Sequence, residues 1–234
     1  MNQMIQFFKQ IYAGVQGQNT PQHISYIRHL QREMQKNLYL DTPLQELKAV
    51  VFDIETTGFY PEQGDQVLSI GAVKMSGSSI LSSDTFYSLI RTDQLLSPEI
   101  SSLTNIRKEH LQSAPEGKDV LIQFFKFVGN QILIAHHSKH EQAFMKKLTK
   151  ELIKTRFEHR IIDTSFLIRL SNPSLFSLEL EEVCRNCMID IKDRHHALGD
   201  AIMTAKVWSY YLKEAEMKGF VNLRAVYEHL SKIG

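Results

Sequence analysis

The segment FDIETTG, at residues 52–58, constrains this chain more than any other feature. It follows the apolar run at residues 49–52 and predicts a buried strand that ends in Asp53 and Glu55, before a Thr-Thr-Gly turn. Because side chains alternate between the faces of a strand, these two acids point the same way. Burying adjacent acids is costly unless a cation neutralises them. The segment therefore predicts a divalent metal site and, through the metal, phosphate chemistry.

Composition sets broad limits on the class of protein. The chain has 234 residues and a net charge of +1, which neither indicates nor excludes a nucleic-acid partner. Cys184 and Cys187 are too few for a disulfide framework or a full zinc site, so a cytoplasmic location is expected. No apolar run approaches the roughly 20 residues of a membrane span, and we expect no membrane association.

The order of the periodic segments predicts an α/β fold. Strands are expected at residues 48–54, 66–74, 79–91, 131–135 and 160–163. Helices are expected at residues 99–103, 108–112, 118–128, 138–155, 177–185 and 197–218. The first three strands are joined by short links, which favours an antiparallel meander, and the later strands alternate with helices. This order predicts a five-stranded mixed sheet flanked by helices.

The chain divides into three parts on these patterns. Residues 1–46 are predicted to form an N-terminal helical extension, residues 47–216 the main domain, and residues 217–234 a C-terminal helical tail. The extension contains apolar residues at helical spacing and a Thr20-Pro21 helix start. Its helices either pack on the main domain, the interpretation we favour, or dock a partner protein.

Two later acids, Glu141 and Asp200, each begin a mainly apolar stripe, a row of residues at helical spacing. The stripe from Glu141 continues through Met145, Leu148 and Leu152. The stripe from Asp200 continues through Thr204, Val207 and Tyr211. Both acids therefore face inward. A lone acid in such a place is usually a cap or one half of an ion pair, but these two can converge on Asp53 and Glu55.

His195 lies five residues before Asp200. Its ordinary pKa of about 6.5 suits a proton acceptor near neutral pH. Four acids and a histidine are the groups that two-metal phosphodiester hydrolysis needs. The acids hold two ions about 3.5–4 Å apart, and the histidine takes a proton from the attacking water.

Together these motifs resemble those of the DEDDh 3′–5′ exonucleases, which are related to the epsilon proofreading subunit of bacterial DNA polymerase III. The resemblance covers roughly residues 47–215. It rests on FDIETTG, on DQVLSIGAV at residues 65–73 and on HHALGDA at residues 195–201. The stretch LTNI at residues 103–106 is similar to the family's TGI stretch, with Asn105 where glycine is usual.

The resemblance implies a ribonuclease H-like fold and a metal-dependent 3′–5′ exonuclease acting on single-stranded 3′ ends, of DNA in preference to RNA. The catalytic residues it implies are Asp53, Glu55, Glu141, His195 and Asp200. The four acids among them would bind two Mg²⁺ or Mn²⁺ ions. The substrate-binding residues it implies are Thr56, Thr57, Gly58, Phe59, His136 and His137. A replication or repair protein on the N-terminal helices is the further partner to consider.

The second family motif departs from the usual pattern. Glu141 replaces an aspartate, His137 an asparagine and His140 a phenylalanine. Metal geometry is sensitive to the extra methylene of glutamate. These changes keep a second hypothesis open: a weakened or inactive exonuclease-fold module that binds nucleic acid or a replication partner.

Two other features have alternative interpretations. Phe59 and Tyr60 either stack on a substrate base or anchor their loop in the core. A basic stretch is a backbone-binding surface or, as we favour, the solvated face of a helix. It comprises Lys139, Lys146, Lys147, Lys150, Lys154, Arg156 and Arg160.

Overall fold

The structure is a computed structural model that describes residues 38–175 and 177–233. The helices predicted within residues 1–37 lie outside the described residues. The strands are β1 (Lys48–Thr56), β2 (Val67–Ser76), β3 (Ser79–Leu89), β4 (Ile132–Ala135) and β5 (Ile161–Asp163). The α-helices described are α3 (Pro98–Thr104), α4 (Lys108–Gln112), α5 (Gly117–Val128), α6 (Lys139–Leu152), α7 (Ser165–Ser171), α8 (Leu180–Asn186), α9 (Ala197–Met217) and α10 (Leu223–Ile233).

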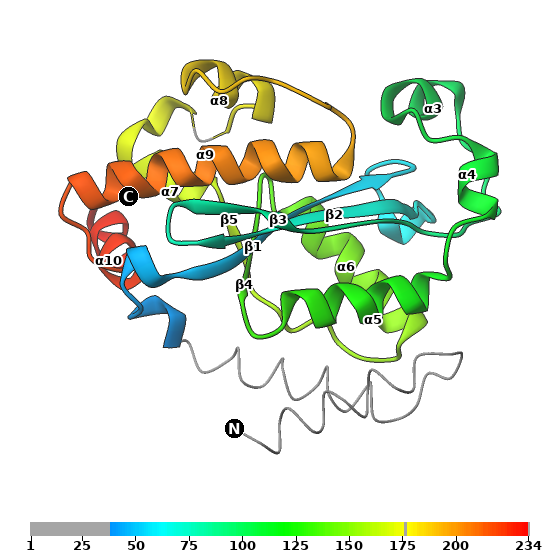
Figure 1. Cartoon of the computed structure of the whole chain (residues 1–234), viewed down its shortest axis with the longest axis horizontal. Coiled ribbons are helices and arrows are strands. Elements are labelled where there is room, and N and C mark those ends of the chain that lie inside the picture. Colours follow the sequence, from blue (N-terminus) through cyan, green and yellow to red (C-terminus); the bar gives the residue numbers. More distant parts are fainter. Residues whose placement is uncertain (1–37, 176, 234) are drawn as a thin grey trace.

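The five strands form one mixed sheet in the order β3-β2-β1-β4-β5 (Figure 1). β1, β2 and β3 pair antiparallel, while β4 pairs parallel with β1 and β5 parallel with β4. The predicted α/β fold, with a meander followed by strand–helix alternation, is confirmed. Because β1 and β4 are parallel, their carboxyl ends meet at one edge of the sheet, where ligands bind in open α/β sheets.

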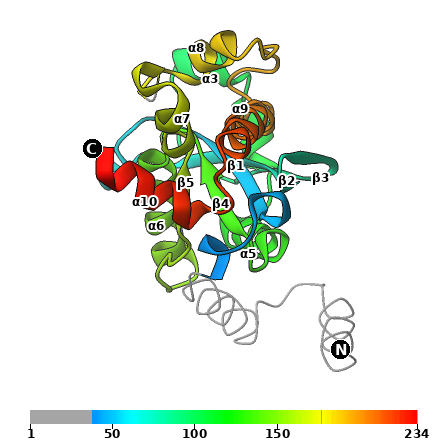
Figure 2. The same ribbon diagram turned by 90° about the vertical axis from the view of Figure 1, so that its left-hand side faces the viewer.

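Helices cover both faces of the sheet (Figures 1 and 2). α7, α8 and α9 lie on one face, and α5 and α6 lie on the other. β1 alternates between them: Ala49 and Val51 belong to the core under α9, and Val50 and Phe52 to the core over α5 and α6. Asp53 and Glu55 have the parity of Val51, so they project on the side of α9.

The start of α9 lies very close to the sheet. Gly71 of β2 pairs in register with Asp53 of β1. A Cβ at Gly71 would lie 2.1–2.5 Å from backbone atoms of Ala197 and Leu198. Only a residue without a side chain permits this approach, because a methyl group here would push the helix away. Gly71 therefore allows the first turn of α9 to lie directly beside Asp53.

The start of α8 differs from the prediction. The helix was expected to begin at residue 177, but it begins at Leu180, after Glu179 with ψ 151°. The carbonyl of Leu178 accepts a hydrogen bond of 2.9 Å from Nε2 of His136. This long-range bond fixes the backbone just before the helix, where only Glu179 is extended, and local periodicity does not contain such a constraint.

The segment before β1 is tied to the segment after α9. The Leu44 amide donates to the Val221 carbonyl at 2.9 Å, and Asp41 pairs with Arg224 through two hydrogen bonds. α10 packs against α7. Within the described parts of the chain, no helix is long and apolar enough to cross a membrane.

Candidate active site

Three carboxylates converge at the carboxyl end of β1. Asp53, Glu55 and Asp200 each offer an oxygen, and these oxygens all lie within 4.8 Å of one another. The first two project from the end of β1, and Asp200 lies in the first turn of α9. The convergence follows from strand parity and from the close approach of α9 at Gly71.

Glu141 reaches the same region from α6. A three-residue turn separates the end of β4 from the start of this helix, so its first turn lies near the carboxyl ends of β4 and β1. Glu141 is 4% exposed, lines one cavity with Asp53 and Asp200, and raises the pKa of Asp53 by like-charge repulsion. The structure therefore brings all four predicted metal-binding acids to one cavity of about 620 Å³.

Burial and mutual repulsion make these carboxylates hard to ionise. Desolvation is the main cause that raises the pKa of Asp53 well above its usual range, and Glu141, Asp200 and Glu55 add to it. Desolvation likewise raises the pKa of Glu55 and of Glu141 to about 8 and that of Asp200 to about 6. A cation is the partner such a cluster requires at neutral pH.

The donor set fits hard divalent cations. Oε2 of Glu141 and Oδ1 of Asp200 are buried and have no hydrogen-bond partner among the described residues. Unpaired buried carboxylate oxygens are costly, and oxygen atoms of this kind are what Mg²⁺ and Mn²⁺ prefer. Asp53, Glu55, Glu141 and Asp200 are therefore the residues fitted to hold such ions.

Arg194 is a neighbour of the cluster that sequence reasoning missed. Its guanidinium pairs with Asp200 through Nη1 and with Glu181 of α8 through Nε at 3.2 Å. It lowers the pKa values of Asp53, Glu55 and Asp200 against the stronger effect of burial. One guanidinium cannot balance four carboxylates. The available signal was its position directly before His195.

His195 lines the cavity and is partly exposed. It has a left-handed backbone with φ 58°, and its amide donates to Oδ2 of Asp200 at 3.3 Å. Burial, and then the charge of Arg194, lower the pKa of His195. Its ring is consequently unprotonated at neutral pH, the state that a proton acceptor needs.

The turn after β1 folds on itself and leaves one ring at the cavity. The Thr56 hydroxyl donates to the Gly58 carbonyl at 2.7 Å, and the Thr57 hydroxyl donates to Asp65 at 3.2 Å. Thr56, Gly58 and Phe59 line the cavity, whereas Thr57 does not. Phe59 is 78% exposed, so it is not a core anchor. It is free to contact a ligand.

The histidines of the second motif have different surroundings. His136 is buried: its Nε2 donates to Leu178, and its Nδ1 lies 2.6 Å from the Thr164 hydroxyl. His137 packs on His136 and is left-handed at φ 56°. Both residues line the cavity, which is compatible with substrate contact. That contact stays a prediction.

Helix α3 forms one wall of the cavity. The sequence predicts this helix but not its place in the site. Ile100, Leu103 and Thr104 line the cavity, and Leu103 is 55% exposed. Asn105 ends the helix at φ 55°. Asparagine tolerates this left-handed conformation better than most residues, so it can end the helix where a glycine would otherwise be favoured.

Comparison with known proteins decides the family. The model of the RNase T family, described as Exonuclease, matches residues 50–208. The chain belongs to this exonuclease family. It is 30% identical over 183 residues to the DNA polymerase III subunit epsilon of Aquifex aeolicus, covering 78% of this chain and 89% of that protein.

A further relative and a solved structure extend the comparison. A PolC-type DNA polymerase III of Clostridium perfringens is 33% identical over 165 residues, which are 70% of this chain and 11% of the polymerase. The chain thus spans about a tenth of the PolC-type relatives. The nuclease domain of 3′hExo, a DEDDh family member bound to rAMP, superposes with a TM-score of 0.62 at 19% identity, covering 71% of this chain and 92% of that domain. The last match shows the fold.

Substituting Asp53→Asn removes one like charge from the metal-free cluster. The folded-state pKa values of these acids lie above their unfolded values, so the folded state binds more protons, and metal-free stability falls as pH rises from about 4 to about 8. At pH 8 with chelator, we expect the variant to melt about 2–4 °C higher than wild type.

Mg²⁺ or Mn²⁺ should raise the melting temperature of wild type and raise that of Asp53→Asn much less. Differential scanning calorimetry measures both effects, with Asp84→Asn, an exposed acid of β3, as the matched control. A wild-type melting temperature insensitive to both metals would contradict the assignment of a metal site.

Proposed function

We propose that this chain is a metal-dependent 3′–5′ exonuclease that hydrolyses phosphodiester bonds at the 3′ ends of single-stranded nucleic acid, with DNA favoured. The observation that carries the proposal is the convergence of Asp53, Glu55 and Asp200, joined by Glu141 and His195 in one cavity. The preference for DNA is supported by the relatives at 30% identity or more, whose names are those of DNA polymerases.

The proposed metal ligands are Asp53, Glu55, Glu141 and Asp200, which would hold two Mg²⁺ or Mn²⁺ ions. When bound, such ions stabilise the charge that develops on the phosphate in the transition state. The four acids come from β1, α6 and α9, so these three elements would set the positions of the ions. Their burial keeps bulk water away and strengthens every charge interaction inside.

His195 is the proposed general base. Its unprotonated ring accepts the proton of the attacking water, and its exposed side lets that proton leave to solvent. The Asp200 carboxylate, by accepting from the His195 amide, holds the left-handed turn that directs the ring to the cavity. A positioned base of this type contributes about 10²–10⁴-fold in rate.

The turn after β1 is the proposed seat of the 3′-terminal nucleotide. Thr56 and Gly58 line the cavity and offer backbone groups, Thr57 between them is a further proposed contact, and the exposed Phe59 ring offers a face for the terminal base. Stacking of a base on such a ring is worth about 1–3 kcal/mol. His136 and His137 are the further proposed contacts, at the opposite end of the second motif from Glu141.

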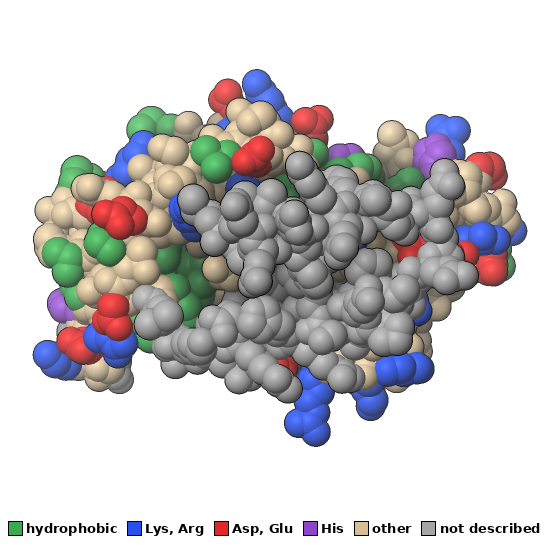
Figure 3. All heavy atoms as spheres, turned by 60° about the horizontal axis from the view of Figure 1, so that its bottom comes forward, with side chains coloured by type: hydrophobic (Ala, Val, Ile, Leu, Met, Phe, Trp, Pro, Cys, Tyr) green, Lys and Arg blue, Asp and Glu red, His purple; other side chains and the backbone are tan. Residues whose placement is uncertain are grey.

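The rest of the chain is assigned more coarsely. We take residues 47–216 as the catalytic unit, with residues 1–46 and 217–234 as helical additions and the former as a candidate site for a replication or repair protein. Figure 3 shows Lys and Arg side chains interspersed with Asp and Glu around the margin of the face that it presents. This mixture favours a solvated surface over a continuous nucleic-acid track.

A second candidate function is a weakened or inactive module that binds nucleic acid. Glu141 and His137, where the family has aspartate and asparagine, favour it. The burial of an unpartnered Glu141 oxygen beside Asp53 and Asp200 favours the active enzyme, because such an oxygen lacks a partner until a cation binds.

The protein is expected to shorten a 5′-labelled single-stranded oligonucleotide from its 3′ end in Mg²⁺ or Mn²⁺. Asp53→Ala should reduce the rate at least 10³-fold, because it removes a metal ligand, while Asp84→Ala should match wild type. Gel electrophoresis of the products reads both results. No ladder with wild type, or equal ladders with Asp53→Ala, would sink the proposal.

Glu141→Asp separates the two candidate functions. If the extra methylene is accommodated by the cavity, the variant loses activity about 10-fold or more, because a shorter side chain misplaces the carboxylate. A large gain in rate indicates a weakened site instead. No turnover with either side chain, together with oligonucleotide binding measured by fluorescence anisotropy, supports the inactive module.

A further inference from the structure

The turn between β1 and β2, residues 57–66, is built around one carboxylate; we refer to it as the substrate turn. Asp65 accepts from the Thr57 hydroxyl at 3.2 Å and from the Tyr60 amide at 2.9 Å. A Cβ at Gly58 would lie 2.4 Å from the same carboxylate, so the turn closes tightly. Phe59 and Tyr60 stand out from it, 78% and 62% exposed.

These internal bonds set the shape of the substrate turn but not its position over the acids. At its β2 end the Thr92 hydroxyl donates to Oε1 of Gln66, and the contacts to its middle, around Phe59 and Pro61, come from α6. The His140 ring lies edge-on to Phe59 at 5.8 Å between centroids. Seven residues on, Nζ of Lys147 donates to the Pro61 carbonyl at 2.7 Å and to the Asp65 carbonyl at 3.3 Å. A spacing of seven puts both residues on one face of the helix.

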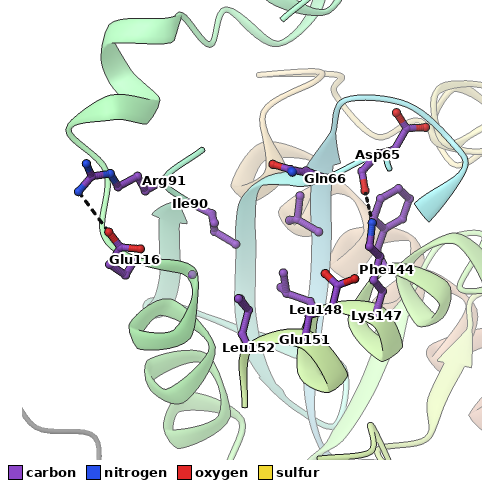
Figure 4. A pocket seen from close by; sticks show the side chains of 12 residues that line it. Asp65, Gln66, Ile90, Arg91, Glu116, Phe144, Lys147, Leu148, Glu151 and Leu152 are labelled. Atoms are coloured by element: carbon purple, nitrogen blue, oxygen red, sulfur yellow. Dashed lines mark hydrogen bonds and ion pairs between the residues drawn. The ribbon is translucent and has the colours of Figure 1, made fainter. Parts of the chain in front are cut away.

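Figure 4 shows Lys147 extending from α6 to Asp65 at one side of a cavity of about 170 Å³. Phe144, Leu148 and Leu152 of the same helix line that cavity. An ammonium group has three donors, and here two of them go to backbone carbonyls. Among the described residues, no carboxylate lies within ion-pair distance of Lys147, so its contacts serve the main chain of the turn rather than a surface ion pair.

We propose that Lys147 is a positioning residue for substrate binding: it clamps the substrate turn to α6 and thereby sets Phe59 relative to the acid cluster. The proposal rests on the proposed function. α6 also carries Glu141, six residues and about 9 Å along the helix from Lys147. One rigid helix therefore carries Glu141 of the acid cluster, the neighbouring His140 ring that contacts Phe59, and, two turns on, the lysine that holds the backbone of the turn.

This assignment separates Lys147 from the other lysines of the basic stretch. Lys146 and Lys150 are exposed, whereas Lys147 is half-buried under the turn. Replacing Lys147 by methionine removes its hydrogen bonds to the Pro61 and Asp65 carbonyls. Methionine keeps most of the apolar stem in the cavity that Phe144 and Leu148 also line, and it removes the charge and the donors.

Limited chymotrypsin digestion of the full chain tests the clamp without any need for activity. Lys147→Met should accelerate cleavage of the Phe59–Tyr60 bond about 10-fold, because the turn opens more often, as mass spectrometry of the fragments measures; the Tyr60–Pro61 bond is resistant because proline follows it. Lys150→Met should match wild type. Equal cleavage of wild type and Lys147→Met, or the same acceleration in Lys150→Met, overturns the clamp.

Steady-state kinetics on a single-stranded oligonucleotide tests what the clamp does. Lys147→Met should raise KM about 5–10-fold and change kcat less than twofold, since ground-state binding is what it loses. In a Phe59→Ala background the same substitution should raise KM less than twofold, because the two residues act as a unit. An equal rise in both backgrounds would mean that Lys147 binds the phosphate backbone itself, and the proposal fails.

The two proposals fail in distinguishable ways. If wild type digests no oligonucleotide, the proposed function fails, while the chymotrypsin comparison still decides whether Lys147 holds the turn. If wild type digests the oligonucleotide and Lys147→Met is cleaved and binds substrate like wild type, the clamp alone is refuted.

Discussion

The repulsion among four carboxylates in one cavity is the constraint on which the rest of this structure depends. Asp53, Glu55, Glu141 and Asp200 come from three separate elements, and burial raises the pKa of each. Hydrophobic packing alone would not collect them, because each unpaired charge opposes folding. The arrangement makes physical sense as a cation-binding site, and Arg194 offsets a part of the charge from its position beside Asp200.

The scaffold meets this constraint with rigid elements rather than with loops. The parity of β1 directs two acids to one side, and the missing side chain at Gly71 lets α9 bring Asp200 beside them. The short turn between β4 and α6 brings Glu141 to the same edge. The same helix then reaches the substrate turn through Lys147. Groups that handle the phosphate and groups that handle the base thus share one frame.

Much of this was predictable from local patterns. The parity of Asp53 and Glu55, and the inward stripes beginning at Glu141 and Asp200, are consequences of strand and helix periods, and the structure bears them out. The order of strands followed from short links and strand–helix alternation. These features depend on residues close in sequence, which is why a single chain reveals them.

The unpredicted features depend on partners far away in the sequence. Lys147 bonds to backbone carbonyls more than 80 residues earlier, and His136 bonds to Leu178, 42 residues later, which delays the start of α8. The wall formed by α3 likewise meets the acids only through the fold. Neither periodicity nor residue type specifies such pairs, because many lysines and carbonyls are equivalent until the chain is folded.

The central claim is that the four acids together hold two divalent ions. The direct measurement is a crystal structure of the protein soaked in Mn²⁺ and a nucleoside monophosphate, with anomalous scattering used to locate the metal. We predict two manganese peaks about 3.5–4 Å apart, with a Glu141 oxygen close enough to bind an ion directly or through one water. A single peak, no peak, or a Glu141 carboxylate turned away from both ions would contradict it.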